Sequence, residues 1–243
     1  MKIYIPLLEK QESVVRQKDT IISILYFVVA SILVFGEAIR NQQLVTVFKP
    51  ILIPLLAALY FLSSTKRSGI YFLALLMAVA SNVMLIFSTN PLIFYGVTAF
   101  LVYRALVIIV VVNYTAKFHP LAFVIAIIPF LFIFIYLLDM TQATLSTGLY
   151  PAMANALVMS VLAALSLSNY VFEDDRRNSW LLISSLLFVV LMFIFVIERF
   201  YLENPVFRPL SVIIFSTAHF AFYRYLILSE TEPADEPDEV GSV

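Results

Sequence analysis

The sequence predicts an all-α integral membrane protein, a bundle of eight transmembrane helices. Of the 243 residues, 62% are hydrophobic and only 13% are charged, whereas a soluble domain of this size needs a more polar surface. The apolar residues form eight runs of about twenty residues, which is the length of a helix that crosses a bilayer. Strands of a transmembrane barrel are shorter and alternate in polarity, so the runs exclude a barrel.

The eight predicted spans follow one another with short connections. They cover approximately Thr20–Glu37, Leu44–Leu62, Gly69–Phe87, Pro91–Val112, Leu121–Leu138, Leu149–Tyr170, Trp180–Ile197 and Leu210–Leu228. Charged and turn-forming residues separate them, for example at Arg40–Gln43, Ser63–Arg67, Ser88–Asn90 and Glu173–Ser179. Pro50 and Pro54 predict a kink in the second span, because proline removes a helical hydrogen bond. The short connections favour antiparallel neighbours within one bundle.

The two flanks of the bundle differ from the spans in composition. Residues 1–19 mix apolar and charged residues, and we expect a cytoplasmic N-terminal segment that lacks the pattern of a cleaved signal peptide. Residues 20–228 form the predicted transmembrane domain. Residues 229–243 are acidic and contain almost no large apolar residues, so we expect a disordered cytoplasmic tail.

The distribution of lysine and arginine predicts cytoplasmic termini. An even number of spans places both termini on one side, and that side holds ten basic residues against four on the other, with Arg104 left out. The ten are Lys2, Lys10, Arg16, Lys18, Lys66, Arg67, Lys117, Arg176, Arg177 and Arg224, and the four are Arg40, Lys49, Arg199 and Arg208. Cytoplasmic loops carry such an excess. Since no signal peptide is recognisable, a bacterial inner membrane is the predicted location.

Composition excludes several kinds of site. The chain has no cysteine, which excludes disulfides, thiol nucleophiles and zinc–thiolate centres. Two histidines are too few for a histidine-built metal site, and the five glycines form no GxGxxG loop that would cradle a phosphate. We therefore expect no cofactor, no metal and no nucleic-acid partner.

Arg104 is the most informative polar residue, because it lies slightly past the middle of the fourth predicted span. A guanidinium stays charged and is costly at membrane depth, so such a residue marks a functional site by default. The acids of the spans and outer loops, Glu37, Asp139, Glu198 and Glu203, all lie at or beyond the outer ends of the spans. Arg104 either reaches an interface, backbone carbonyls or Asn82, or lines a polar cavity with Lys49 that awaits an anion. Arginine suits a phosphate, and a phospholipid headgroup is the anion most available there.

Two further polar residues, Asn82 and His219, have both a structural and a functional interpretation. Asn82, in the third span, is typical of amides that hydrogen-bond between membrane helices, and this is the interpretation we favour. His219 shares one face of the eighth span with Ser216 and Tyr223. That face either orients a substrate or a water molecule, or His219 is a packing residue.

Four stretches of the sequence resemble the YhhN family of lysoplasmalogenase-like membrane proteins. Phe48-Lys49-Pro50 opens the second span with the Lys-Pro pair of the family, and Phe100 to Arg104 matches its fourth-span stretch with Arg104 in the place of a histidine. Phe188 to Phe200 keeps the frame of the seventh span, and Ala218-His219 stands where the family has Ala-Gln. The resemblance implies an eight-span bundle with a lipid-facing cavity, and hydrolysis of the vinyl-ether bond of a lysophospholipid.

The acidic positions of the family are replaced in this chain. Its Gly-Asp pair reads Ser81-Asn82 and its Ser-Asp pair reads Leu191-Met192. Addition of water to a vinyl ether ordinarily requires a carboxyl group that donates and accepts a proton. Asn82 can hydrogen-bond but cannot cycle a proton, and Met192 can do neither, so the catalytic residues stay unknown.

The sequence leaves three functions open. The first is a lysoplasmalogenase-like hydrolase in which Lys49 and Arg104 bind the phosphate of an anionic lysophospholipid, while Asn82 and His219 position water. The second is a non-catalytic relative that binds or senses a lipid. The third is a small transporter, which the kinked second span suggests although no inverted repeat is visible. The predicted binding residues are Lys49, Asn82, Arg104, His219 and Tyr223, and the oligomeric state is left open.

Overall fold

The computed structural model describes residues 5–87, 90–145, 149–200, 202 and 204–231 of the chain, and this part folds into eight helices and no strand. The helices are α1 (Ile5–Ala38), α2 (Gln42–Ser63), α3 (Gly69–Ile86), α4 (Asn90–Tyr114), α5 (Pro120–Leu145), α6 (Leu149–Phe172), α7 (Arg176–Phe200) and α8 (Phe207–Thr231). Each contains a stretch long and apolar enough to cross a membrane. The predicted all-α membrane bundle of eight spans is confirmed.

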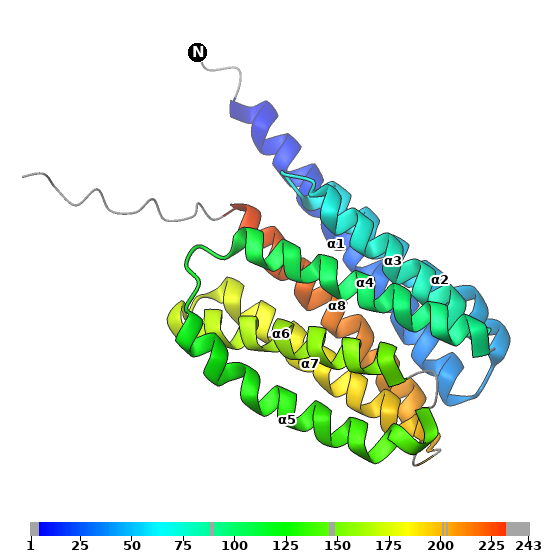
Figure 1. The fold of residues 1–243 in the computed structure, drawn as a ribbon. Coiled ribbons are helices and arrows are strands. Elements are labelled where there is room, and N and C mark those ends of the chain that lie inside the picture. Colours follow the sequence, from blue (N-terminus) through cyan, green and yellow to red (C-terminus); the bar gives the residue numbers. More distant parts are fainter. Residues whose placement is uncertain (1–4, 88–89, 146–148, 201, 203, 232–243) are drawn as a thin grey trace, which may run out of the picture.

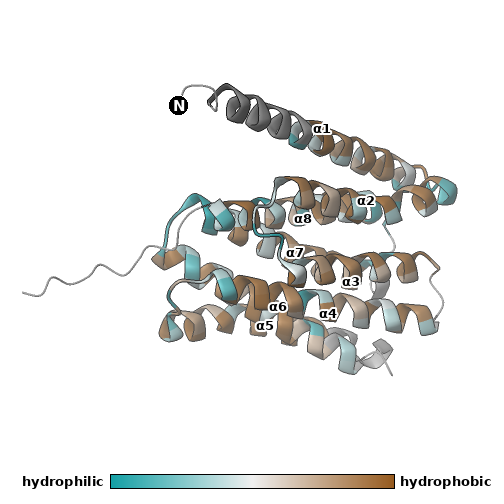
Figure 2. Ribbon diagram, turned by 90° about the horizontal axis from the view of Figure 1, so that it is seen from above, coloured by the Kyte–Doolittle hydropathy of each residue, from teal (hydrophilic) through white to brown (hydrophobic). Residues whose placement is uncertain are grey.

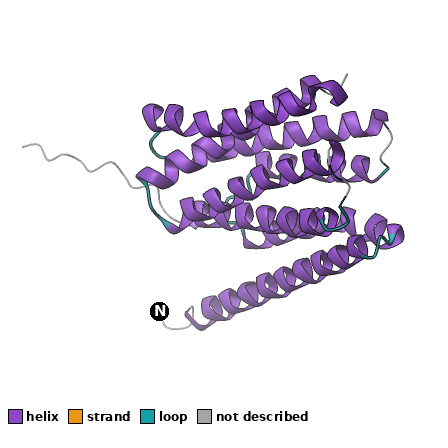
Figure 3. Cartoon of the chain, turned by 90° about the horizontal axis from the view of Figure 1, so that it is seen from below, coloured by secondary structure: helices purple, strands orange, loops and turns teal. Residues whose placement is uncertain are grey.

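The helices pack as four antiparallel hairpins, α1–α2, α3–α4, α5–α6 and α7–α8, with further contacts of α8 to α1 and α2 and of α6 to α4 and α7. Figure 1 shows α8 between the group formed by α1 to α4 and the group formed by α5 to α7. The secondary-structure view contains helices and short loops only (Figure 3). The membrane-length stretches of α6 and α8 are the most buried of the eight, so these two helices hold the centre of the bundle.

The helices are hydrophobic along most of their length and polar near their ends, as expected for a protein that crosses a bilayer. Brown, hydrophobic residues cover most of the helix lengths in Figure 2, whereas teal residues gather near the helix ends and turns. Large apolar side chains remain on the outside of the bundle, for example Phe132, which is 72% exposed, and Leu121. A lipid environment accounts for this exposure, since the contact of so much apolar surface with water would be strongly unfavourable.

Local side chains fix where the helices begin. Asn41 precedes α2, and its side-chain oxygen accepts hydrogen bonds from the backbone N–H groups of Gln43 at 3.1 Å and Leu44 at 3.2 Å. This is the N-cap geometry that satisfies donors left free at a helix start.

Gly96 permits the close approach of α3 and α4, because an added Cβ would lie 2.9 Å from Cγ of Leu85.

The first and last helices extend past the predicted limits of the transmembrane domain. Helix α1 begins at Ile5, so it includes most of the expected N-terminal segment, while its membrane-length stretch is residues 19–38. Helix α8 continues three residues beyond the predicted boundary at 228, to Thr231. The remainder of the predicted tail, residues 232–243, lies outside the described residues.

Glu230, at the end of α8, is buried although it was assigned to the tail. Its carboxylate accepts hydrogen bonds from the Tyr60 hydroxyl at 2.7 Å, the Ser64 hydroxyl at 2.6 Å and the backbone N–H of Thr65 at 3.1 Å. These donors satisfy the charge, which would be costly to bury alone. The end of α8 is therefore fixed to the turn between α2 and α3.

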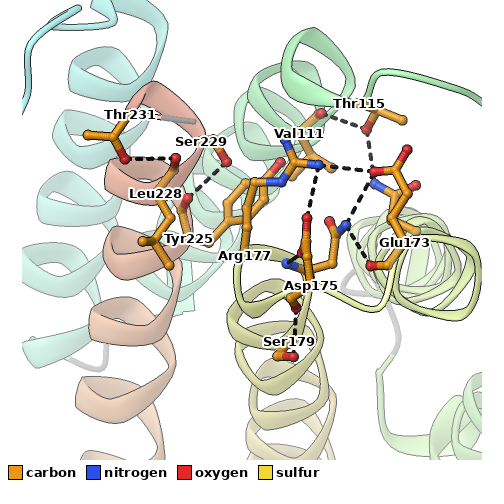
Figure 4. Close-up of polar contacts among 12 residues, drawn as sticks. Val111, Thr115, Glu173, Asp175, Arg177, Ser179, Tyr225, Leu228, Ser229 and Thr231 are labelled. Carbon is orange, nitrogen blue, oxygen red and sulfur yellow. Dashed lines mark hydrogen bonds and ion pairs between the residues drawn. The ribbon is translucent and has the colours of Figure 1, made fainter. Parts of the chain in front are cut away.

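A second polar cluster lies on the same side of the bundle, at the turn between α6 and α7. Arg177 is placed between Glu173 at 3.0 Å and Asp175 at 3.4 Å, as Figure 4 shows. In the same turn Asp175 caps α7 by accepting from the backbone N–H of Asn178 at 2.6 Å. The charges of Glu173, Asp175 and Arg177 are thus paired within this turn.

Candidate functional site

Arg104 lies inside the bundle on α4 and is only 4% exposed. Its Nη1 donates a hydrogen bond to Oδ1 of Asn155 on α6 at 2.6 Å, and the same nitrogen lies 3.8 Å from Sδ of Met192 on α7. The guanidinium carbon stands 4.5 Å above the ring of Phe100, one turn away on α4. Arg104 thereby joins three helices.

All of these neighbours of Arg104 are neutral. None of the ion pairs within the described part of the chain involves Arg104, and its Nε is buried without a hydrogen-bond partner there. An amide oxygen, a thioether and an aromatic face each attract a cation, but none of them removes its charge. The centre of the bundle therefore carries a net positive charge.

Asn155, the hydrogen-bond partner of Arg104, is a residue that the sequence analysis missed. It is buried on α6, and its Nδ2 donates to the carbonyl oxygens of Pro151 at 3.2 Å and Val97 at 3.4 Å. These two bonds leave Oδ1 to face Arg104. The available signal was an amide inside an apolar run, the same signal that singled out Asn82.

His219 occupies an aromatic enclosure at the middle of α8. Its ring stacks on that of Tyr103, with 5.3 Å between the ring centroids, and meets the ring of Phe188 edge-on at 4.9 Å between centroids. The centroid of the Phe215 ring lies 4.1 Å from that of His219. Nδ1 lies 2.9 Å from the carbonyl oxygen of Phe215, and because a carbonyl only accepts, Nδ1 is the donor. Nε2 is buried without a partner among the described residues, so this histidine packs through its ring and keeps one nitrogen free.

Asn82 lies on α3 and is buried beside Ser81. Neither the amide nitrogen of Asn82 nor the hydroxyl of Ser81 has a hydrogen-bond partner in the part of the chain that the structure describes. The expected interhelical hydrogen bond from the Asn82 amide nitrogen is therefore not formed. Polar atoms that are buried without a hydrogen-bond partner are rare and costly. A bound water molecule or ligand is one way in which such atoms gain a partner.

Lys49 interacts with a different set of residues from Arg104. Its Nζ is 4.0 Å from Oε1 of Glu37 at the end of α1, and its side chain is 29% exposed. Two more charges act on it, Glu198 and Arg208, which are themselves joined by a hydrogen bond of 3.1 Å. Lys49 thus belongs to a charged group at the end of the bundle opposite the termini, and it already has an acid.

Tyr223 also lies apart from the centre, although it is one turn from His219. Its hydroxyl donates to the hydroxyl of Ser63 at 2.8 Å, and it lines a hollow of about 910 Å³ between α1 and α8. A second hollow of about 350 Å³ is apolar and lies between α5 and α7. Arg104 and Lys49 line neither of these two hollows, so the cavity predicted for them remains a prediction.

Apart from Asn82 on α3, the predicted residues divide among three places. Arg104 and His219 lie in the centre, with the neighbouring α4 residue Tyr103 stacked on the imidazole. Lys49 lies at one end and Tyr223 near the other. Within the described residues no group of three or more His, Cys, Asp or Glu side chains is placed to hold a metal ion.

The family model of the YhhN family matches residues 44–227 of the chain. The chain belongs to the YhhN family. No curated protein and no solved structure matches it. The matched residues run from the start of α2 to near the end of α8, so α1 precedes them.

Two positions that the YhhN resemblance singled out are in contact. Arg104 stands in the place of the family's histidine and Met192 in the place of an aspartate, and Nη1 and Sδ of these residues are 3.8 Å apart. They come from α4 and α7, 88 residues apart in the sequence. Two of the positions that the resemblance singled out thus meet in the centre of this YhhN protein, with an arginine and a methionine where the resemblance implies a histidine and an acid.

Proposed function

We propose that this YhhN-family protein binds the phosphate of an anionic lysophospholipid at Arg104 without cleaving the lipid. The observation that carries the proposal is the buried guanidinium whose neighbours are all neutral. A buried cation without a counter-charge is strongly unfavourable. An anion that binds beside it supplies the missing charge.

The donors of Arg104 suit a phosphate. A guanidinium presents five N–H groups in one plane; the bonds described above use Nη1, whereas Nε has no partner within the described residues. Arginine binds phosphate oxygens through two parallel hydrogen bonds. Lipid phosphate would therefore take the Nε edge and leave the bond to Asn155 in place.

Met192 lies against Nη1 of the same guanidinium and can make room for the lipid beside it. The thioether is a weak acceptor at 3.8 Å, and methionine is flexible enough to move aside without loss of a strong hydrogen bond. Phe100, which lies against the guanidinium and packs on the hydrophobic core, is an apolar surface of the kind that an acyl chain contacts. A lysophospholipid fits such a site better than a free phosphate, because it brings both parts.

The residues present argue for binding over turnover. Hydrolysis of a vinyl ether adds water across the C=C bond, and the resulting hemiacetal divides into a long-chain aldehyde and a glycerophospholipid alcohol. The first step requires a proton donor to carbon, and the family's acidic positions hold Asn82 and Met192. Neither side chain can deliver a proton.

One observation favours hydrolysis as a second candidate function. Nε2 of His219 is buried without a partner among the described residues, and its ring lies against Tyr103, the residue next to Arg104. A neutral imidazole with a free nitrogen can accept a proton from water. In that case Nε2 of His219 would take a proton from water as the water oxygen adds to the ether-bearing carbon, and would deliver that proton to the other alkene carbon.

The two functions are separated with purified full-length protein and a 1-alkenyl lysophospholipid. Binding is followed by the rise in unfolding temperature, and turnover by the release of aldehyde. The proposal predicts stabilisation of the wild type, loss of that stabilisation in Arg104→Met, and no aldehyde above a blank. Arg176→Met, which removes an exposed arginine at the start of α7, is the matched control and should keep the response.

Aldehyde release by the wild type would overturn the non-catalytic proposal, and its loss in His219→Gln would establish the second candidate. Equal stabilisation of the wild type and Arg104→Met would show that the phosphate does not bind at Arg104. Absence of both stabilisation and aldehyde release would contradict both functions and leave transport as the remaining candidate.

A further inference from the structure

A hollow of about 910 Å³ lies between α1 and α8, and Arg104 is not among the residues that line it. Helix α1 diverges from the bundle toward its N-terminus in the views from above and below (Figures 2 and 3). It returns to the bundle farther along, where Tyr26 donates a hydrogen bond to the carbonyl oxygen of Ser216 on α8 at 2.9 Å. We call this hollow the α1–α8 groove.

The groove has a polar end and an apolar end. The polar end lies on the side of the chain's termini and contains Asp19, Arg224 and the hydrogen-bonded hydroxyls of Ser63 and Tyr223. From there the groove follows α1 for more than three turns, to Ile32. Its far part is lined by aliphatic and aromatic side chains that are partly exposed to the surroundings of the bundle, Ile24, Phe27 and Val28 among them.

The polarity of the groove matches one lipid that lies along it. Asp19 stands at the start of the membrane-length stretch of α1, so the polar end is at headgroup depth and the apolar end reaches toward the middle of the bilayer. A phospholipid has this same order of polar head and apolar chain. A soluble ligand would gain little from the apolar part, which faces lipid.

The charges at the polar end specify the headgroup. Asp19 and Arg224 contribute one negative and one positive charge to the groove, and no ion pair between them occurs within the described residues. Oδ1 of Asp19 is buried without a hydrogen-bond partner in that part of the chain. A carboxylate oxygen only accepts, so this atom requires a donor from the occupant.

We propose that the α1–α8 groove binds one zwitterionic phospholipid with a primary ammonium, of the phosphatidylethanolamine type. Arg224 pairs with its phosphate, Asp19 accepts a hydrogen bond from its ammonium, and one acyl chain lies along Ile24 to Ile32. A choline headgroup has no N–H to donate, and a glycerol headgroup leaves Asp19 facing a net negative lipid. The proposal is independent of the lipid at Arg104, because α1 and α4 contribute to different sites.

The test compares lipids of identical acyl chains bound to the full-length protein by native mass spectrometry. We expect phosphatidylethanolamine to bind about tenfold more tightly than phosphatidylcholine or phosphatidylglycerol, the difference made by one charge-assisted hydrogen bond. Asp19→Asn should remove most of this preference, and Arg224→Gln should weaken all three lipids. Asp174→Asn and Arg176→Gln, exposed residues on the same side of the bundle, are the matched controls.

The position of the lipid is tested separately with a phosphatidylethanolamine that carries a photoreactive group in its acyl chain. Cross-links should map to Ile24, Phe27, Val28, Ser31 and Ile32, which line the groove away from its polar end. Equal affinity for the three lipids in the wild type would overturn the proposal without any need for a variant. Cross-links confined to other helices would also overturn it, as would a stable dimer whose two copies cover the α1–α8 groove.

Discussion

The bond between Arg104 and Asn155 makes the two residues energetically dependent on each other. Asn155→Leu keeps a side chain of similar size but removes the acceptor at 2.6 Å. The charged donor is then left without its strongest partner, which costs about 1.5–3 kcal/mol, the value of a hydrogen bond to a charged group. Arg104→Met removes the charge and leaves only a neutral amide oxygen unsatisfied, at a cost of about 1–3 kcal/mol.

The double variant tests whether this dependence exists. With both polar groups gone, no buried partner remains unsatisfied, so its loss of stability should fall short of the sum of the single variants by about 1.5–3 kcal/mol, the value of a hydrogen bond to a charged group. The free energies come from equilibrium unfolding of the purified variants in one detergent. Ser160→Ala, on α6 with a hydroxyl bonded only to its own helix at Ala156, combined with Arg104→Met is the control pair and should be additive.

A coupling energy below about 0.5 kcal/mol, which is the range for independent sites, would refute the reasoning. It would mean that the guanidinium leaves Asn155 in the folded protein at no cost. Added lysophospholipid extends the test, since its phosphate supplies a counter-charge to the guanidinium: it should raise the stability of Asn155→Leu and leave that of Arg104→Met unchanged.

The remaining predictions concern the frame around the site. Glu230→Gln should lower the free energy of unfolding by about 2–4 kcal/mol, because a neutral amide replaces a buried carboxylate that accepts three short hydrogen bonds; unchanged unfolding would contradict the fixed end of α8. Gly96→Ala should destabilise by about 1–3 kcal/mol, since its Cβ would lie 2.9 Å from Leu85, whereas Gly69→Ala, with nothing within 4 Å, should not; equal effects would count against the close packing of α3 and α4. Lys49→Met should change stability by less than about 1 kcal/mol, as for other partly exposed ion pairs, and should leave lysophospholipid affinity unaltered; a tenfold loss of affinity would instead return Lys49 to the binding site.

The spans could be predicted from the sequence because hydrophobic length is a local property. Each of the eight runs became a helix, and the boundaries differ mainly where a helix continues beyond its apolar run. Helix α8 is the example: Glu230 reads as the first acid of a polar tail, but donors from the turn between α2 and α3 satisfy it. That turn is about 165 residues away in the chain, so no local pattern could reveal the contact.

The candidate site was predicted in part for the same reason. Arg104 and His219 were found because each is conspicuous within its own run. Asn155 was missed because its role depends on the pairing of α6 with α4, which helix periodicity does not specify. Tyr223 shares a helix face with His219 by spacing, yet it faces Ser63 and the α1–α8 groove. The spacing of residues along one helix determines the direction in which a side chain points. Which residues that side chain contacts depends on the neighbouring helix.

The central claim is that the uncompensated charge of Arg104 binds a lipid phosphate, and the ³¹P chemical shift of a bound lipid tests it most directly. An alkyl lysophospholipid, which has no vinyl ether to cleave, is titrated into the wild type, Arg104→Met and the control Arg176→Met. We predict a separate phosphate resonance that saturates at one lipid per chain in the wild type and the control, and its absence in Arg104→Met. The same resonance in all three proteins would contradict the claim.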